Sequence, residues 1–281
     1  MNRVLQMFFF LVVFCVSGMV NAEGVVWFDD FSRPDSADLD NGWVEVNEKL
    51  TSDYVGGLWA PKAFISVDQG GMAFTYGGLS SYSPSYGTLP YAYKILSGAV
   101  DLPASYSFTY SPHQNERVFH EVGLMNSVDG MVDVSGTNYV KYHPYNGIVI
   151  QIGRSGSSYD NSSLLLHKYV DGVRSDGAVH YLSFQYDYGE VYKIRVELLD
   201  MEHVRVSVSS GGDIYGYEDT LSSGELSLDQ FVVNGLDTGA SMEVIGAQYD
   251  YILYIDNITL FSPTMCWFSS VDSLECTGKL N

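Results

Sequence analysis

The sequence predicts an all-β protein that folds as a sandwich or a barrel. About a dozen short segments combine alternating hydrophobicity with β-branched and aromatic residues, which strands prefer. Clusters of Gly, Asn, Asp, Ser and Pro separate these segments, as turns between strands do. After the N-terminal apolar run, no segment has the periodicity of an amphipathic helix, and no fixed-period repeat indicates a propeller or a solenoid.

The strongest strand prediction covers residues 249–261, YDYILYIDNITLF, near the C-terminus. This segment is apolar on both faces and contains no Gly or Pro, which predicts a strand buried on both sides in a two-sheet stack. Residues 25–31, near the N-terminus, are its natural partner. We therefore expect the two ends of the domain to meet in one sheet.

The other elements follow in order between these two strands. Residues 32–43 and 77–91 are rich in turn-forming residues and are expected to be loops. The clearest hairpin joins residues 192–199 to 203–209, because both arms alternate between apolar and polar side chains. The remaining strands are expected at residues 64–67, 72–76, 106–110, 118–125, 147–152, 163–170, 179–186, 231–233 and 242–247.

Residues 1–22 have the features of a signal peptide. Arg3 precedes an apolar run that reaches Val20, and the small residue Ala22 ends a cleavage motif. The alternative is an N-terminal membrane anchor, and no later stretch is long and apolar enough to span a bilayer. We expect signal cleavage, a secreted or periplasmic protein, one domain over residues 23–262 and a short tail over residues 263–281.

The chain carries a formal net charge of −20 at pH 7. Such acidity argues against nucleic acids and anionic membranes as partners, because both repel a negative surface. It is typical of an extracellular protein in salty water or of a Ca²⁺-binding protein, and a requirement for solubility explains it equally well. A polyanionic glycan stays open as a partner, because a local basic patch or a bridging cation is enough to bind one.

Cys266 and Cys276 are the only cysteines that remain after signal cleavage. Two thiols in an exported chain most simply pair with each other, so we expect a disulfide. The bridge closes a short loop and should contribute about 2–3 kcal/mol, which suits a role in fixing the tail rather than the core.

The run DDFSRPDS at residues 29–36, followed by Asn41-Gly42-Trp43, resembles the opening of the concanavalin A-like lectin/glucanase superfamily, which includes laminin-G-like domains. The segment YIDNI at residues 254–258 resembles the closing strand of that superfamily. The resemblance covers residues 25–261 and implies a jelly roll of two antiparallel sheets, one of them concave. It implies no single function, because the superfamily holds lectins, glycosidases, polysaccharide lyases and adhesion modules.

The E-x-D-x-x-E motif, which carries the catalytic acids of the glucanase branch, is absent. A different catalytic candidate is the set Arg117, His120, Tyr142 and His143, in a predicted strand and the loop after it. A lyase needs a cation that neutralises a uronate carboxylate, a base for the α-proton and an acid for the leaving oxygen, and Arg, His and Tyr supply these groups. The alternative is that the histidines are ordinary surface residues and the tyrosines serve packing.

Aromatic residues around the loop at residues 77–91 predict a contact surface for sugars. Tyr82, Tyr86 and Tyr91 are interleaved with Gly, Ser and Pro, and Trp59 lies upstream. Flat rings stack on the apolar faces of sugars, and Tyr hydroxyls bond to sugar hydroxyls. The alternative is that some of these rings are strand core and others anchor the loop.

Related jelly rolls often hold a structural Ca²⁺ where the first and last strands meet, so the resemblance implies such a site here. The hard oxygen donors that the chain offers at this place are Asp29, Asp30, Asp256 and Asn257. Hydrogen bonding at the strand ends is the alternative role of these residues.

We therefore predict an exported domain that binds a polysaccharide or another glycan on its concave face. The first alternative is an enzyme of the same fold that cleaves a polysaccharide. For this enzyme we favour β-elimination over hydrolysis, because the E-x-D-x-x-E motif is absent and Glu116 and Glu121 are the only candidates for a hydrolytic carboxylate pair near the set. The second alternative is an adhesion or surface-structural module with a protein partner. Apart from Ca²⁺, no cofactor is expected.

Overall fold

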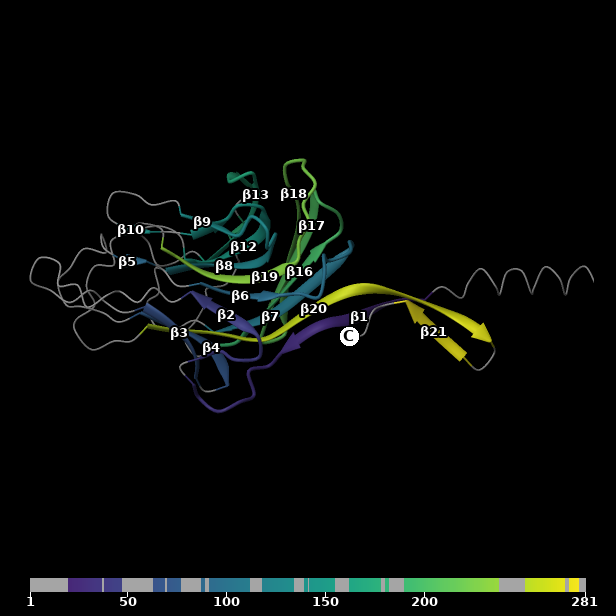
Figure 1. The fold of residues 1–281 in the computed structure, drawn as a ribbon, viewed down its shortest axis with the longest axis horizontal. Helices are drawn as coiled ribbons and strands as arrows, with labels where there is room; N and C mark the ends of the chain where they lie inside the picture. Colours follow the sequence, from purple (N-terminus) through teal and green to yellow (C-terminus); the bar gives the residue numbers. More distant parts are fainter. Residues whose placement is uncertain are drawn as a thin grey trace, which may run out of the picture.

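The structure is a computed structural model. It describes residues 20–36, 38–46, 63–68, 70–76, 87–88, 91–111, 118–133, 139–140, 142–154, 162–177, 180–181, 190–237, 251–270 and 273–277. Over these ranges the regular elements are strands, and most of them belong to two antiparallel sheets that pack face to face (Figure 1). The described part contains no helix that is long and apolar enough to cross a membrane. The predicted all-β class and the two-sheet stack are confirmed.

The first sheet, here called sheet A, has nine described strands in the order β18-β17-β16-β7-β20-β4-β3, with β1 and β21 also paired to β20. Their bounds are β18 Asp213–Thr220, β17 His203–Ser210, β16 Tyr192–Leu198, β7 Ala104–Ser111, β20 Tyr251–Ser270, β4 Gly71–Tyr76, β3 Ala63–Asp68, β1 Val20–Asp29 and β21 Ser273–Thr277.

The second sheet, sheet B, has eight described strands in the order β14-β13-β12-β8-β19-β6-β2, with β15 also paired to β13. Their bounds are β14 Val173–Asp176, β13 Ser162–Val170, β12 Gly147–Arg154, β8 Val118–Met125, β19 Gln230–Asp237, β6 Tyr91–Ile95, β2 Trp43–Val46 and β15 His180–Tyr181. Two short pairs lie outside these sheets, namely β9 Met131–Asp133 with β11 Tyr142–Pro144, and β5 Gly87–Thr88 with β10 Tyr139–Val140.

The first and last strands of the domain are neighbours in sheet A, as predicted. β1 runs antiparallel to β20, with Asp29 opposite Ile258. β20 continues past Pro263 to Ser270 and pairs there with β21, so the three strands form a ribbon that extends away from the sandwich (Figure 1). The expected boundary between domain and tail therefore falls inside a strand. β1 begins at Val20, within the expected signal peptide, whose residues 1–19 lie outside the described part.

The hydrophobic core lies between the two sheets. Phe108 of β7 and Leu124 of β8 are typical members, and both are buried. Burial of a side chain of this size stabilises the fold by about 1.5–3 kcal/mol. The hairpin predicted at residues 192–209 is confirmed, because β16 and β17 pair in register and alternate buried with accessible side chains.

The closing strand differs from its prediction. A register shift between Asp256 and Thr259 interrupts the pairing of β20 with β7. Such a bulge resets the two-residue alternation, so Ile255 and Ile258 both become fully buried, although strict alternation had placed them on opposite faces. Asp256 and Thr259 are only half-buried. The prediction of burial on both faces is therefore wrong at this place, and the outer face of sheet A is open to water there.

The DDFSR…NGW opening has a structural explanation. The Asp29 side chain accepts hydrogen bonds from the backbone N–H of Phe31 at 2.9 Å and from the Arg33 guanidinium at 2.7 and 3.3 Å. It also accepts hydrogen bonds from the Asn41 side-chain amide at 3.1 Å and from the Trp43 Nε1–H at 2.9 Å. Burial alone would raise the pKa of Asp29, but the bonds from Arg33, Phe31, Trp43 and Asn41 outweigh it and lower that pKa. One carboxylate thus joins the end of β1 to the loop and to β2.

Candidate functional site

A polar cluster lies on the outer face of sheet B, the face that does not pack against sheet A. Because side chains alternate along a strand, β8 sends Val122 and Leu124 into the core and Glu121 to the outer face. The register places Asn234 of β19 opposite Glu121 on one side and Gln151 of β12 opposite it on the other. A row of polar side chains therefore crosses the centre of the sheet.

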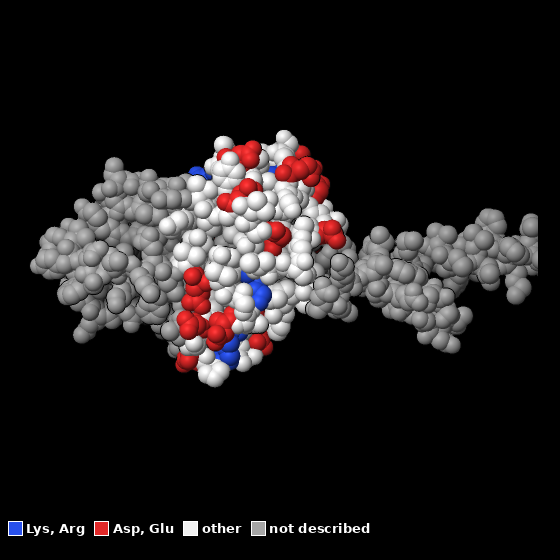
Figure 2. All heavy atoms as spheres, viewed as in Figure 1, with Lys and Arg blue, Asp and Glu red and all other residues white. Residues whose placement is uncertain are grey.

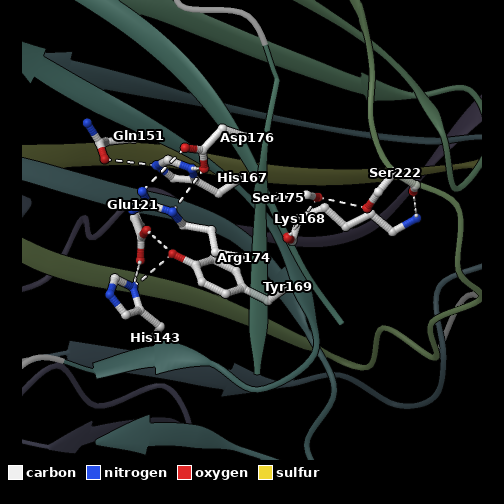
Figure 3. Close-up of polar contacts among 10 residues, drawn as sticks. All are labelled: Glu121, His143, Gln151, His167, Lys168, Tyr169, Arg174, Ser175, Asp176 and Ser222. Atoms are coloured by element: carbon white, nitrogen blue, oxygen red, sulfur yellow. Dashed lines mark hydrogen bonds and ion pairs between the residues drawn. The ribbon is translucent and has the colours of Figure 1, made fainter. Parts of the chain in front are cut away.

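Glu121 is the centre of this cluster and has 0% of its surface exposed. Its carboxylate accepts a hydrogen bond from the Tyr169 hydroxyl at 2.7 Å and lies 3.3 Å from His143 Nδ1 (Figure 3). It also accepts a hydrogen bond from the Asn234 amide at 3.2 Å. Burial alone would raise the pKa of Glu121, but the contacts with His143, His167 and Tyr169 outweigh it and lower that pKa. The carboxylate is therefore ionised at neutral pH.

His143 reaches the cluster from β11, which pairs with β9. Its ring stacks on the ring of Tyr169 with 5.2 Å between the centroids, and its Nδ1 lies 2.8 Å from the Tyr169 oxygen. Tyr169 has one hydroxyl proton, which it donates to Glu121, so the Nδ1–H of His143 is the donor in the second bond. The other ring nitrogen, Nε2, has no partner among the described residues, and the side chain is 14% exposed.

Asn234 has an unpaired polar atom in the same place. Its amide nitrogen donates to the Glu121 carboxylate and to the backbone oxygen of Tyr142, which fixes the orientation of the amide. The amide oxygen is buried and has no hydrogen-bond partner among the described residues. An unpaired buried acceptor costs about 1–3 kcal/mol, so Asn234 lowers the stability of the fold at this place while its amide nitrogen orients Glu121.

A second histidine extends the cluster toward the edge of the sheet (Figure 3). His167 of β13 is buried, with Nδ1 2.7 Å from the Asp176 carboxylate and Nε2 2.8 Å from the Gln151 side-chain oxygen. Arg174 pairs with the same Asp176 at 2.9 Å. Burial lowers the pKa of His167, even though Glu121 and Asp176 favour its charged form.

Tyrosine rings border the cluster on the side of β6. The rings of Tyr91 and Tyr142 lie 5.1 Å apart, and those of Tyr91 and Tyr93 are stacked at 6.3 Å. All three side chains are partly accessible. Burial and the neighbouring tyrosines raise the pKa of Tyr91 to about 12, so its hydroxyl stays protonated and able to donate. The outer face thus combines accessible rings with hydrogen-bonding groups.

The structure brings part of the predicted catalytic set together and separates another part. Tyr142 and His143 belong to the cluster. His120 does not, because it points from β8 into the interior, where it is 0% exposed and burial lowers its pKa to about 3. Its neighbour Glu121 takes the outward position instead. Arg117 lies outside the described residues.

Sequence reasoning missed His167, Tyr169 and Asn234. The alternation of β13 offered a signal, because His167 and Tyr169 are two residues apart and share a face. Lys168 between them points the opposite way and donates to the backbone oxygen of Ser222 (Figure 3). It also donates to the backbone oxygens of Met201 and Gly224. Lys168 therefore joins loops on the other side of the sheet and takes no part in the outer-face cluster.

Of the four predicted sugar-contacting residues, Tyr91 lies on the outer face of sheet B. Trp59, Tyr82 and Tyr86 fall outside the described residues, and their role stays a prediction.

The predicted Ca²⁺ ligands are only partly placed. The Asp29 carboxylate is engaged by four neighbouring residues, as described above, and Asp30 accepts two hydrogen bonds from Ser32. Asp256 lies opposite Thr109 in the register of β20 and β7, and the side chain of Asn257 is not described. Within the described ranges, no three His, Cys, Asp or Glu side chains are grouped so as to hold a metal ion. Calcium binding stays a prediction, which melting with and without a chelator tests.

The predicted disulfide has a suitable backbone register. Cys266 and Cys276 lie directly opposite each other in the antiparallel pair of β20 and β21. Opposite residues in such a pair have Cα atoms about 4.5–5.5 Å apart, which is within the range that a disulfide spans. The disulfide itself stays a prediction.

Comparisons with known proteins extend the description of the fold. No protein-family profile and no curated protein matches this sequence. Similar solved structures include β-agarase A from Zobellia galactanivorans, with a TM-score of 0.54, 9% identity and coverage of 88% of this chain and 94% of that one. They also include the catalytic domain of an endo-1,3-β-glucanase (laminarinase) from Thermotoga petrophila, with a TM-score of 0.53, 12% identity and coverage of 87% and 99%.

A third similar structure is the CBM2 module of the evolved Dit protein of Lactobacillus casei phage J-1, with a TM-score of 0.51, 11% identity and coverage of 86% of this chain and 97% of that one. At such identities the likeness concerns the fold alone. Together with the order and antiparallel pairing of the two sheets, it confirms the two-sheet antiparallel jelly-roll fold that the resemblance in the opening motif implied.

Proposed function

We propose that this protein binds a polysaccharide on the outer face of sheet B. The observation that carries the proposal is the combination of accessible tyrosine rings with a polar group on this face. The rings of Tyr91 and Tyr142 lie 5.1 Å apart and are partly accessible. His143, whose side chain is 14% exposed, has no partner for Nε2 among the described residues. Sugars present hydroxyl groups at their edges and apolar patches on their faces, which this combination of acceptors and rings complements.

The similar structures support a carbohydrate ligand without identifying it. Two of them are named for polysaccharide-cleaving activities, and a third is named as a CBM2 module. The same fold therefore occurs both in enzymes that cleave polysaccharides and in a module of another protein. In this chain the binding role accounts for the rings as well as the polar row. Export by a signal peptide over residues 1–22 is part of the proposal, because an exported protein meets polysaccharides outside the cell.

Cleavage by β-elimination is the second candidate, and the geometry of His143 favours it. Glu121 and Tyr169 fix the Nδ1–H of His143, which leaves the lone pair of the ring on Nε2. A histidine held in this tautomer by a carboxylate is suited to act as a general base. Tyr91, whose hydroxyl stays protonated, would then be the candidate acid that donates a proton to a leaving oxygen.

The binding proposal is tested by Tyr91→Ala and Tyr142→Ala, measured by calorimetry against a panel of neutral and uronate polysaccharides. Each loss of a ring should weaken binding about fivefold to thirtyfold, which corresponds to about 1–2 kcal/mol. Phe28→Ala is the matched control, because it removes a half-exposed ring from β1 of sheet A. Equal losses in the control and the two tyrosine variants would place the ligand elsewhere.

The same panel separates the candidate functions. Release of reducing ends together with the ultraviolet absorbance of an unsaturated uronate would establish β-elimination, and release of reducing ends alone would establish hydrolysis. Binding with neither signal supports a lectin-like module. If the protein binds no polysaccharide of the panel, the proposal is wrong, and an adhesion module with a protein partner is the remaining candidate.

A further inference from the structure

We infer that the glycan site extends from Tyr91 along β6 and onto the edge strand β2, as an uncharged platform that takes the apolar faces of neutral sugars. This inference rests on the proposed function, because it concerns the same face of sheet B. It adds the place where the polysaccharide chain lies and the class of sugar that the chain contains.

The first step is that the pair of β9 and β11 covers the centre of the face. A cluster of buried apolar side chains lies there, formed by Met125, Val149, Tyr169 and Val232. Met131 of β9 packs against this cluster, and the backbone oxygen of Tyr142 in β11 accepts a hydrogen bond from Asn234. Glu121 and Asn234 are 0% exposed. A ligand chain therefore needs accessible surface beside this pair of strands.

The second step is that β6 and β2 provide such a surface. Ala92 of β6 and Trp43 of β2 belong to the core, so the residues that alternate with them face outward. These outward residues, here called the platform, are Val44, Val46, Tyr91, Tyr93 and Ile95. Ile95 is 58% exposed and Val44 is 37% exposed, and the other three are partly accessible.

The platform is continuous and has room for more than one sugar. The register of β2 and β6 sets Val44 opposite Tyr93 and Val46 opposite Tyr91, so the two rows of side chains are direct neighbours. From Tyr91 to Ile95 the outward row runs about 13 Å along β6, which is longer than one sugar ring. The affinity for a suitable glycan should therefore increase with the length of the chain.

The third step is that the charged residues of these two strands face away from the platform. Lys94 donates to the backbone oxygen of Asn41, and its Nζ lies 5.8 Å from the centre of the Trp27 ring. Glu45 accepts a hydrogen bond from the backbone N–H of Leu39, which is a core residue. Both side chains thus share the inner side of sheet B with the core. The described outward side chains of β2 and β6 carry no charge.

The surroundings of the platform disfavour an acidic sugar. Arg174, a cation on the outer face, belongs to β14 at the opposite edge of sheet B and is paired with Asp176 at 2.9 Å. On the side of the platform, Glu121 adds a negative charge one strand beyond β19. A sugar carboxylate on the platform would lose water without gaining a cation, whereas a neutral sugar avoids this cost.

The tyrosines of the platform favour a sugar over another apolar ligand. Tyr91 also forms the ring pair with Tyr142, with 5.1 Å between the centroids, so the platform continues the proposed contact surface. A tyrosine ring stacks on the apolar face of a sugar, and its hydroxyl bonds to a sugar hydroxyl. Val44, Val46 and Ile95 supply further apolar contact beside the rings.

The test measures binding by calorimetry for neutral oligomers of glucose, galactose and mannose and for the matching uronate oligomers, each at increasing chain length. The affinity for at least one neutral series should increase with length. The uronate oligomer of the same length and linkage should bind about tenfold more weakly, because its carboxylates lose water without a partner.

Three variants at exposed positions assign the effect to the platform. Ile95→Asp and Val44→Asp each remove apolar contact and add a charge, so binding of the neutral oligomer should weaken about fivefold to tenfold. Ile95→Lys should instead raise the affinity for the uronate oligomer relative to the neutral one, because it supplies the missing cation.

Ile214→Asp and Ile214→Lys are the matched controls, because Ile214 is 77% exposed on β18 of sheet A. Both should change every affinity by less than about twofold. Circular dichroism and the melting temperature establish that all variants are folded. The comparison of neutral with uronate oligomers uses the wild type, so misfolding of one variant leaves that comparison decisive.

The outcomes are separable. If Tyr91→Ala weakens binding but folded Ile95→Asp and Val44→Asp do not, the inference is wrong and the proposed function stands. The same holds if the wild type binds uronate oligomers as tightly as neutral ones. Sedimentation tests another occupant, because a wild-type dimer that Ile95→Asp dissociates at unchanged glycan affinity would show that a second copy covers the platform. If no oligomer binds, the proposed function fails, and the inference fails with it.

Discussion

Asp29→Asn tests the structural role of the opening motif. The substitution keeps the shape of the side chain but removes its charge and replaces one acceptor oxygen with an NH₂ group. The Asp29 Oδ2 atom accepts from the Trp43 indole at 2.9 Å and from Asn41 at 3.1 Å, so an NH₂ group at this position would face two donors. The charged bond from Arg33, 2.7 Å from Oδ1, is weakened as well.

The expected loss follows from these contacts. Leaving the buried Trp43 N–H without an acceptor costs about 1–3 kcal/mol, and a hydrogen bond between charged groups contributes about 1.5–3 kcal/mol. We therefore expect the free energy of unfolding to fall by about 3–5 kcal/mol, in line with the loss of one partner from a buried pair. For a domain of this size the melting temperature should fall by roughly 6–20 °C.

The assay is urea unfolding of both proteins at neutral and acidic pH. Because the folded-state pKa of Asp29 is lowered, its contribution is present above the unfolded-state pKa of about 4 and is lost as the pH falls through the folded-state value. The gap between wild type and Asp29→Asn should therefore shrink below about pH 4. Asp30→Asn is the control, since Asp30 bonds only to exposed Ser32 atoms and should change stability by less than about 0.5 kcal/mol. Equal effects of the two substitutions would refute the reasoning.

Three further predictions concern other parts of the structure. Tyr169→Phe removes the hydroxyl that donates to Glu121 and accepts from His143, so the free energy of unfolding should fall by about 1–3 kcal/mol. The pKa of Glu121 should also rise, and carbon NMR of its carboxyl group would detect this change. Lys168→Met leaves the backbone oxygens of Ser222 and Gly224 without their charged donor, and urea unfolding should show a loss of about 1–3 kcal/mol, whereas an unchanged protein would show that water replaces the ammonium group. Thiol titration of the denatured, unreduced mature protein should detect no free thiol from Cys266 or Cys276, and two free thiols per chain would disprove the disulfide.

Local sequence patterns predicted many of the described strands and the meeting of the two ends, because these depend on periodicity and on the neighbours of each residue. They missed β2, β6, β14 and β18, and the strand expected at residues 242–247 lies outside the described residues. They failed where geometry depends on distant pairing. Strict alternation could not locate the bulge between Asp256 and Thr259, which reverses the faces of β20. For the same reason the sequence did not show which face of the sheet each side chain occupies. His120 was predicted as a site residue, whereas in the structure its neighbour Glu121 faces outward.

The candidate site could be predicted only in part for the same reason. Glu121 and Asn234 are 113 residues apart in the sequence and become neighbours only through the pairing of β8 with β19. Tyr169 reaches the same carboxylate from β13, two strands away. Tyr142 and His143 were found because they belong to a local run of Tyr and His. Composition also predicted an acidic surface, and Figure 2 shows more acidic than basic side chains on the face in view.

The central claim is that a glycan binds the outer face of sheet B. Hydrogen exchange of the mature protein, with and without the tightest-binding oligosaccharide of the panel, tests it most directly. We predict that the bound glycan slows exchange in peptides from β6, β8, β11 and β13, which carry Tyr91, Glu121, His143 and Tyr169. Protection confined to β16, β17 and β18 of sheet A would contradict the claim.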